Sequence, residues 1–260
     1  NAVKESESIR LIREELRQQV FAERARHRTK YQATIESKYQ TGLKPWREVI
    51  IPHQDVINGS YQQAEFAADL DQVQRGIASS EYGDPIEFYK RTFITEGLKY
   101  LLSNALKRFN SIGGDPVIEL QTNFGGGKTH SMLALFHLCS GIALDQLPGL
   151  DQICSEIGVN TIPKASRAVL VGTAFNPTKA DIKPDGTEVN TLWGELAWQL
   201  GGKEGFAQIA DSDRQKVAPG ARELASLFEK NGPCLILIDE WVAYARNLVS
   251  NPNLPAGTYD

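Results

Sequence analysis

The segment Thr122-Asn123-Phe124-Gly125-Gly126-Gly127-Lys128-Thr129 decides the fold of this chain. The apolar run 117–120 precedes it and an apolar helical pattern at 131–138 follows it, which predicts a strand, a glycine-rich turn and a helix. Glycines let the backbone N–H groups turn inward, where they form a cradle for phosphate oxygens together with the helix N-terminus. We expect Lys128 to contact the β- and γ-phosphates and the Thr129 hydroxyl to bind Mg²⁺. The usual pattern opens with glycine, where this chain has threonine.

Two carboxylates directly follow a second apolar run. Asp239 and Glu240 come after Leu235–Ile238, so they are predicted at the carboxyl end of a buried parallel strand, where α/β sheets bind ligands. We expect Asp239 to hold the magnesium and Glu240 to act as general base toward the attacking water. An apolar run ending in Asp-Glu is equally typical of a strand that enters a polar loop, and the upstream glycine-rich segment favours the catalytic interpretation.

The remaining pattern predicts an α/β fold with a parallel sheet. A further strand is predicted at 168–173, and helices are predicted at 192–200 and 221–229. No guanine-binding Asn-Lys-x-Asp occurs, the nearest segment being 176–181, and the Asp-Glu doublet favours ATP and an AAA-like or RecA-like P-loop nucleoside triphosphatase.

In those branches another strand separates the two site strands. We therefore expect an incomplete sheet in this chain, with the sensor strand and any arginine finger beyond Asp260. Residues 235–238 should then not be hydrogen-bonded to residues 117–120, and the isolated chain should hydrolyse ATP poorly.

The chain before this domain is basic and helical. Apolar residues at helical spacing run from Ile9 to Tyr39, interrupted by the basic stretch 24–30, and glycine and proline at 42–45 end the pattern. This predicts a helical segment at 1–44 and an ATPase domain at 45–260. The basic stretch is interpreted either as a nucleic-acid or acidic-partner contact or as a solvated face. Farther on, Asp84-Pro85 starts a helical apolar stripe that continues to Phe109.

Composition narrows the class of protein. Residues 1–47 carry eleven Lys or Arg against six Asp or Glu, whereas the rest carries seventeen against twenty-six, so the body predicts no broad nucleic-acid surface. Cys139, Cys154 and Cys234 form no CxxC pair, and two of them lie in apolar runs where a thiol packs as a small hydrophobe, so we expect reduced cysteines. With no apolar run long enough for a membrane span and no signal segment, we expect a cytoplasmic protein.

Several single residues have two interpretations. His53 and Val56 would flank the adenine or belong to a linker, because AAA-type proteins wrap the base with the segment before the core. His130 follows the predicted metal-binding threonine, where a packing or capping role competes with contact to phosphate. The tryptophans Trp193, Trp198 and Trp241 are predicted as core or interface aromatics.

The chain resembles large bacterial and archaeal ATPases of a domain-of-unknown-function class, often encoded beside adenine-specific DNA methyltransferases and helicases in phage-defence clusters. The resemblance covers about residues 45 to 250 and rests on Pro52 to Val56, Asp84-Pro85, Thr95-Glu96-Gly97-Leu98, Asn123 to His130, Thr191-Leu192-Trp193-Gly194-Glu195 and Asp239-Glu240. It implies ATP and Mg²⁺ as cofactors, with Lys128 and Glu240 catalytic and a nucleotide-binding segment made of Asn123, Phe124, Gly125, Gly126, Gly127, Lys128, Thr129 and His130. It also implies a longer protein that assembles as a homo-oligomer and acts with DNA and with DNA-modification or defence proteins.

Two functions are consistent with these expectations. One is an enzyme that hydrolyses ATP to remodel or move along nucleic acid. The other is a slow nucleotide-dependent switch that controls oligomerisation or partner binding. DNA-stimulated turnover would distinguish the first from the second.

Overall fold

The structure, a computed structural model, describes residues 44–59, 68–121, 125–159, 161 and 164–248, together with Gln19 and Ala22. The chain divides into two compact units, 1–61 and 62–260. The described part of the first unit holds two short helices, α2 (Trp46–Val49) and α3 (Gln54–Asn58). The predicted N-terminal helix lies outside the described residues apart from Gln19 and Ala22, which are both helical.

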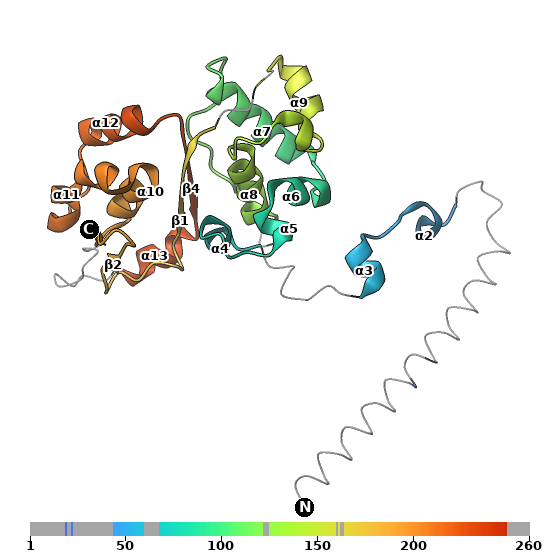
Figure 1. Cartoon of the computed structure of the whole chain (residues 1–260), viewed down its shortest axis with the longest axis horizontal. Helices are drawn as coiled ribbons and strands as arrows, with labels where there is room; N and C mark the ends of the chain where they lie inside the picture. The colour runs from blue at the N-terminus through green and yellow to red at the C-terminus, as the bar shows by residue number, and fades with distance from the viewer. Residues whose placement is uncertain are drawn as a thin grey trace, which may run out of the picture. The chain divides into compact units, whose positions relative to one another are not determined.

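The second unit places helices around a two-stranded parallel sheet, which confirms the predicted α/β class (Figure 1). Strands β1 (Ser166–Val171) and β4 (Cys234–Asp239) pair in register from Ser166 opposite Cys234 to Val171 opposite Asp239. A separate antiparallel hairpin joins β2 (Asp181–Ile182) and β3 (Glu188–Val189). The helices in chain order are α4 (Leu70–Gln74), α5 (Ser80–Gly83), α6 (Pro85–Arg91), α7 (Glu96–Phe109), α8 (Lys128–Leu138), the 3₁₀ turn η2 (Leu144–Gln146), α9 (Leu150–Ile157), α10 (Leu192–Ala207), α11 (Ala210–Gln215), α12 (Ala221–Asn231) and α13 (Trp241–Asn247).

Both faces of the parallel sheet are covered. Because successive side chains of a strand point to opposite faces, Val169 and Leu237 enter one core with helices α4 to α9, and Ala168 and Leu170 enter a second core with α10, α12 and α13. Figure 1 shows the two groups of helices on either side of the strands. The continuously apolar sequences of β1 and β4 are therefore explained by burial on two sides.

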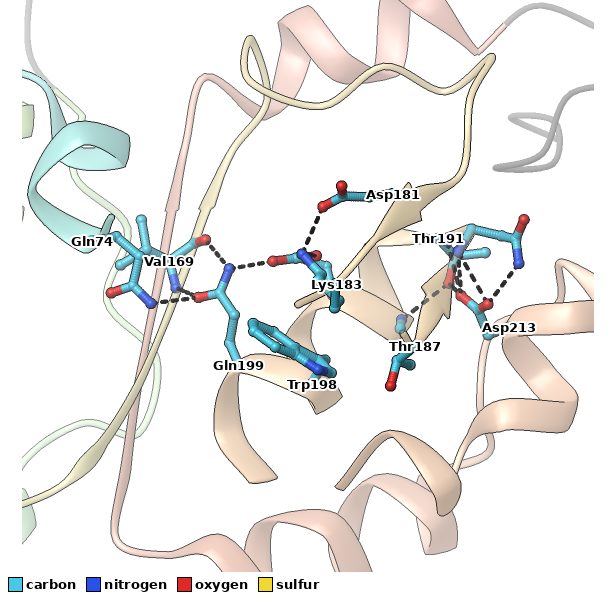
Figure 2. A network of polar contacts seen from close by, with 12 residues as sticks. Gln74, Val169, Asp181, Lys183, Thr187, Thr191, Trp198, Gln199 and Asp213 are labelled. Atoms are coloured by element: carbon cyan, nitrogen blue, oxygen red, sulfur yellow. Dashed lines mark hydrogen bonds and ion pairs between the residues drawn. The ribbon is translucent and has the colours of Figure 1, made fainter. Parts of the chain in front are cut away.

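Gln199 closes the outer edge of β1. The N–H groups of Ser166 and Gly172 donate to Pro233 and Asp239 next to or within β4, so the backbone groups of Val169 point away from that strand. The Gln199 side chain accepts from the Val169 N–H at 2.7 Å and donates to the Val169 carbonyl at 2.9 Å (Figure 2). A side-chain amide thus occupies the place of a neighbouring strand, and Gln74 holds it through a further hydrogen bond of 3.1 Å.

The Thr191-Leu192-Trp193-Gly194-Glu195 segment is built around two buried carboxylates (Figure 2). Thr191 caps α10 and donates its N–H and hydroxyl to Asp213, which is 1% exposed. A Cβ on Gly194 would overlap Asp213 Oδ1, so only glycine fits there. Glu195 forms an ion pair of 2.5 Å with the buried Lys183. These contacts give the segment a structural role.

The predicted strand at 117–120 is wrong. These residues have no regular secondary structure, and Val117 is 83% exposed. A strand needs a hydrogen-bonded neighbour, and no described strand lies along this segment. The prediction that residues 235–238 are not hydrogen-bonded to residues 117–120 is confirmed, because β4 pairs with β1.

The apolar stripe between Asp84 and Phe109 is divided into two helices rather than one. Helix α6 begins at Pro85 with the Asp84 side chain as N-cap, and it ends at Arg91. Thr95 then caps α7, with its hydroxyl accepting from the Leu98 N–H at 3.3 Å. A residue with β-region backbone angles at the N-cap interrupts the helical backbone. The apolar residues therefore keep their helical spacing in the sequence although the helix is broken.

The cysteines are free thiols, as predicted, and Cys139 and Cys154 are buried. Burial raises the pKa of the Cys139 thiol to about 12. Trp193 and Trp241 are 37% and 41% exposed, so they are not core residues, and their interpretation as interface aromatics stays a prediction. Trp198 donates from its indole N–H to Asp185 at the surface.

His137 should make the fold sensitive to acid. Burial lowers its pKa to about 4, against about 6.5 in an unfolded chain. Stability is therefore fully present above pH 6.5 and is lost as the pH falls toward 4, with a loss of about 2 kcal/mol at pH 5. Denaturant unfolding between pH 7 and pH 4 should show this slope. His137→Gln should flatten it, whereas the same change at exposed His53 should leave it unaltered.

Candidate functional site

The glycine-rich segment enters α8 through two left-handed glycines. Gly125 has φ 79° and Gly127 has φ 76°, values that side-chain-bearing residues rarely adopt, and Gly127 is the N-cap of α8. The helix begins at Lys128, so Lys128 and Thr129 occupy its first turn. The predicted contact residues Asn123 and Phe124 lie outside the described residues. The loop therefore presents backbone N–H groups at a helix N-terminus, an arrangement that favours anions.

The two predicted metal ligands are brought together from positions 110 residues apart. The Thr129 hydroxyl on α8 donates to Asp239 Oδ2 at the end of β4, across 2.9 Å. The other oxygen, Asp239 Oδ1, accepts from the Glu240 N–H at 3.0 Å. The carboxylate is thus oriented by bonds to both of its oxygens. A hydroxyl and a carboxylate at this separation are oxygen donors of the kind that Mg²⁺ prefers.

This donor set fits magnesium only when a ligand supplies further oxygens. Within the described ranges, no cluster of three or more His, Cys, Asp or Glu side chains is arranged to hold a metal ion. Mg²⁺ is commonly bound by one or two protein oxygens together with substrate phosphates and water. Thr129 and Asp239 beside a phosphate-type loop match that description.

Glu240 has a strained backbone. Its φ of 52° lies in the left-handed region, and it is the N-cap of α13. Non-glycine residues held there cost on the order of 1–3 kcal/mol and are concentrated at functional sites. The side chain is exposed and follows Asp239 directly, so the carboxylate is available at the same end of the sheet.

Gly172 packs closely against the backbone of Asp239 and Glu240, although the sequence pattern assigns it only to a predicted strand. A Cβ at Gly172 would overlap the Glu240 carbonyl oxygen. The Gly172 N–H donates to the Asp239 carbonyl at 2.8 Å. The only sequence signal is its place directly after the apolar run of β1, at the carboxyl end of a parallel strand.

Gly172→Ala should therefore destabilise the fold by about 1–3 kcal/mol and displace Glu240, because the added methyl group overlaps backbone atoms. Denaturant unfolding would measure the loss. Gly97→Ala is the matched control, since a Cβ there would meet no atom within 4 Å beyond its chain neighbours and the backbone of its own helix, and alanine favours helix α7. Equal stabilities of the two variants would contradict the close approach.

His130 is held by α6. Its ring lies 4.7 Å from the Phe88 ring between centroids, and its Nε2 lies 3.0 Å from the Thr92 hydroxyl. Thr92 donates its own proton to the Phe88 carbonyl at 2.7 Å, so the imidazole Nε2–H donates to Thr92. Burial lowers the pKa of His130. These contacts support the packing interpretation, and a nucleotide contact from His130 stays a prediction.

The two adenine-site candidates belong to the first unit. His53 is exposed just before α3, and Val56 within α3 is 45% exposed. Their contact with a base stays a prediction.

The fold and this corner define an α/β domain in which a glycine-rich helix N-terminus lies beside a carboxylate at the end of a parallel strand. The chain belongs to the DUF499 N-terminal domain family, whose model matches residues 46–259. Neither the curated proteins nor the solved structures gave a match. Across the described part of the chain, every helix is too short or too polar to cross a bilayer.

Proposed function

We propose that this domain binds ATP with Mg²⁺ and that the complete protein hydrolyses it. The observation that supports this proposal is the hydrogen bond of 2.9 Å between Thr129 and Asp239, which joins the glycine-rich loop to the carboxyl end of β4. The sequence alone predicts each of these two residues as a magnesium ligand, independently of any contact between them. A structural hydroxyl–carboxylate pair alone would not require left-handed glycines directly before it.

In the proposed mechanism, the N–H groups of Gly125 to Gly127 and the start of α8 bind the β- and γ-phosphates. Lys128 contacts the β- and γ-phosphates as a charge-assisted donor. Thr129 and Asp239 would hold the magnesium ion, which would neutralise charge that develops on the phosphate oxygens. Glu240 orients the attacking water and accepts its proton.

The proposed preference for ATP and the proposed action on nucleic acid are supported by the sequence and by the family resemblance. Adenine is favoured because the guanine-recognition sequence is absent from the chain. Remodelling of, or movement along, DNA is supported by the resemblance to ATPases encoded beside DNA methyltransferases. A rate of ATP hydrolysis in the full-length protein that increases with added duplex or single-stranded DNA would support this role, and an unchanged rate with either would count against it.

Asp239→Ala should remove the magnesium dependence of ATP binding. The wild-type chain should bind ATP more tightly with Mg²⁺ than with EDTA, and the variant should lose about 10- to 100-fold of that difference, because a bond to a charged group is worth roughly 1.5–3 kcal/mol. Calorimetric titration would measure both affinities. Asp211→Ala is the control, since its carboxylate is 82% exposed and pairs with Arg214 at the surface. Equal affinities with and without Mg²⁺ in the wild type would refute the metal site.

A further inference from the structure

The Glu240 carboxylate has no polar partner that fixes its direction. The residue is exposed, and within the described ranges its side chain makes no hydrogen bond or ion pair. A general base must nevertheless lie within hydrogen-bond reach of the water that it activates. The direction of this carboxylate therefore depends on the backbone that carries it.

The Glu240 backbone is held by the elements on either side of it. Toward β4, its N–H donates to Asp239 Oδ1 at 3.0 Å. Toward α13, its carbonyl accepts from the Ala243 N–H at 2.9 Å, in the first turn of that helix. With a φ of 52°, Glu240 joins strand β4 to helix α13. Any shift of α13 therefore changes the direction of the Glu240 side chain.

One side chain anchors α13 to the rest of the second unit. Tyr244 is the buried residue of this helix, with 4% of its surface exposed, whereas Trp241 and Val242 are 41% and 58% exposed. Tyr244 belongs to the second core, together with residues of β1, α10 and α12. Leu248, directly after the helix, is only partly buried against the same core. The Tyr244 ring is therefore the main contact that places α13.

Tyr244 and Glu240 approach the same glycine. A Cβ built on Gly172 would overlap the Glu240 carbonyl oxygen and would lie 3.1 Å from the Tyr244 Cβ. The end of β1 thus touches the first residue before α13 and the anchor of α13 at once. A change in the packing of Tyr244 would rotate the helix about this contact and move Glu240 with it.

The polar groups behind Tyr244 are fixed by hydrogen bonds. Burial, together with the nearby Asp213 carboxylate, raises the pKa of Tyr244 to about 12, so the phenol is uncharged at neutral pH. Asp213 in turn accepts from the N–H and the hydroxyl of Thr191 (Figure 2). Leu192, the next residue, lies in the same core as Tyr244. The segment at 191–195 therefore supports the surface against which Tyr244 packs.

We infer that Tyr244 is a positioning residue, which holds α13 against Gly172 and thereby directs the Glu240 carboxylate at the attacking water. This inference rests on the proposed function, since it concerns the cleavage step of the same site. It gives the Tyr244 ring a role in cleavage and none in nucleotide binding, because the groups proposed to bind phosphate and magnesium lie on α8, on its preceding loop and on β4.

The test is the cleavage of ATP in a single turnover by variants of Tyr244, with ATP affinity measured in parallel by calorimetric titration. Tyr244→Leu keeps the position apolar and removes the ring, and cleavage should slow by about 10- to 100-fold, since a misplacement of about 1 Å can cost 10²-fold. ATP affinity should stay within about twofold of the wild-type value, because the substitution acts on cleavage alone. Tyr244→Phe keeps the ring and should retain the wild-type rate.

Phe228→Leu is the matched control. Phe228 packs against the same core from α12, a helix that precedes the amino end of β4 and does not carry the proposed site. This variant also loses one aromatic ring from the core, and it should cleave ATP at the wild-type rate.

A double variant separates the positioning of Glu240 from a general loss of stability. If Tyr244 acts through Glu240, adding Tyr244→Leu to Glu240→Gln should cause no further loss of rate, whereas independent effects would multiply. If the leucine variant does not fold, Tyr244→Met, whose flexible side chain adapts to irregular space, takes its place in both backgrounds.

The outcomes distinguish this inference from the proposed function. If the wild-type chain cleaves no ATP even in a single turnover, the proposed hydrolysis is overturned and the role of Tyr244 with it. In a chain that cleaves ATP, the role of Tyr244 alone is overturned by an unchanged rate in the folded leucine or methionine variant. A further loss of rate in the double variant, or an equal loss in Phe228→Leu, would overturn it as well.

Discussion

Replacing Lys128 by alanine should abolish measurable ATP binding. The residue is the first of α8, directly after the left-handed Gly127, so its charge is placed in the turn that is proposed to bind phosphate. Its loss removes a charge-assisted contact to the β- and γ-phosphates and leaves their negative charge uncompensated. Calorimetric titration with ATP and Mg²⁺ would measure the change.

The matched control for that experiment is Lys107→Ala, an exposed position in the last turn of α7. Both variants should unfold at nearly the wild-type denaturant concentration, because neither change removes core packing. ATP affinity close to the wild-type value in a folded Lys128→Ala chain would refute the proposed function as a whole.

Replacing Glu240 by glutamine should separate binding from hydrolysis. The amide has the shape of the carboxylate and cannot accept a proton, so ATP affinity should be retained while the rate of cleavage falls by about 10²- to 10⁴-fold. A single-turnover assay with the protein in excess of ATP would measure this even when turnover is slow.

Glu229→Gln, on the exposed surface of α12, is the control for the loss of one carboxylate. If Glu240→Gln cleaves ATP at the wild-type rate, the proton acceptor must be a different group. Loss of ATP binding in the same variant would instead assign Glu240 to binding.

Several helices and strands are predicted correctly from the apolar pattern of their own segment. The helix predicted at 131–138 lies within α8, and the strands predicted at 168–173 and 235–238 overlap β1 and β4. For the two strands the signal is a continuous apolar run, which is typical of burial on two sides. Thr129 and Asp239 are each predicted as a magnesium ligand from their own segment, and the structure adds the hydrogen bond between them.

The features that were wrongly predicted or missed depend on contacts between segments that are distant in the sequence. Residues 117–120 have the composition of a strand, yet a strand forms only beside a partner, which composition does not encode. Gly172 and Gln199 owe their importance to atoms of Glu240 and Val169, which are distant in the chain. Such tertiary contacts have no periodic pattern in the sequence.

The Gln199 amide also makes the two edges of the parallel sheet unequal as places where a further strand could pair. Unpaired strand edges are templates on which foreign chains add and aggregates start, and at Val169 this template is already occupied by a side chain from the same molecule. On the opposite margin, the backbone groups of Ile236 and Ile238 face away from β1, and no described strand pairs with them. An additional strand along β4 would lie next to the carboxylates of Asp239 and Glu240, so enlargement of the sheet at that edge would also bring new residues to the proposed catalytic site.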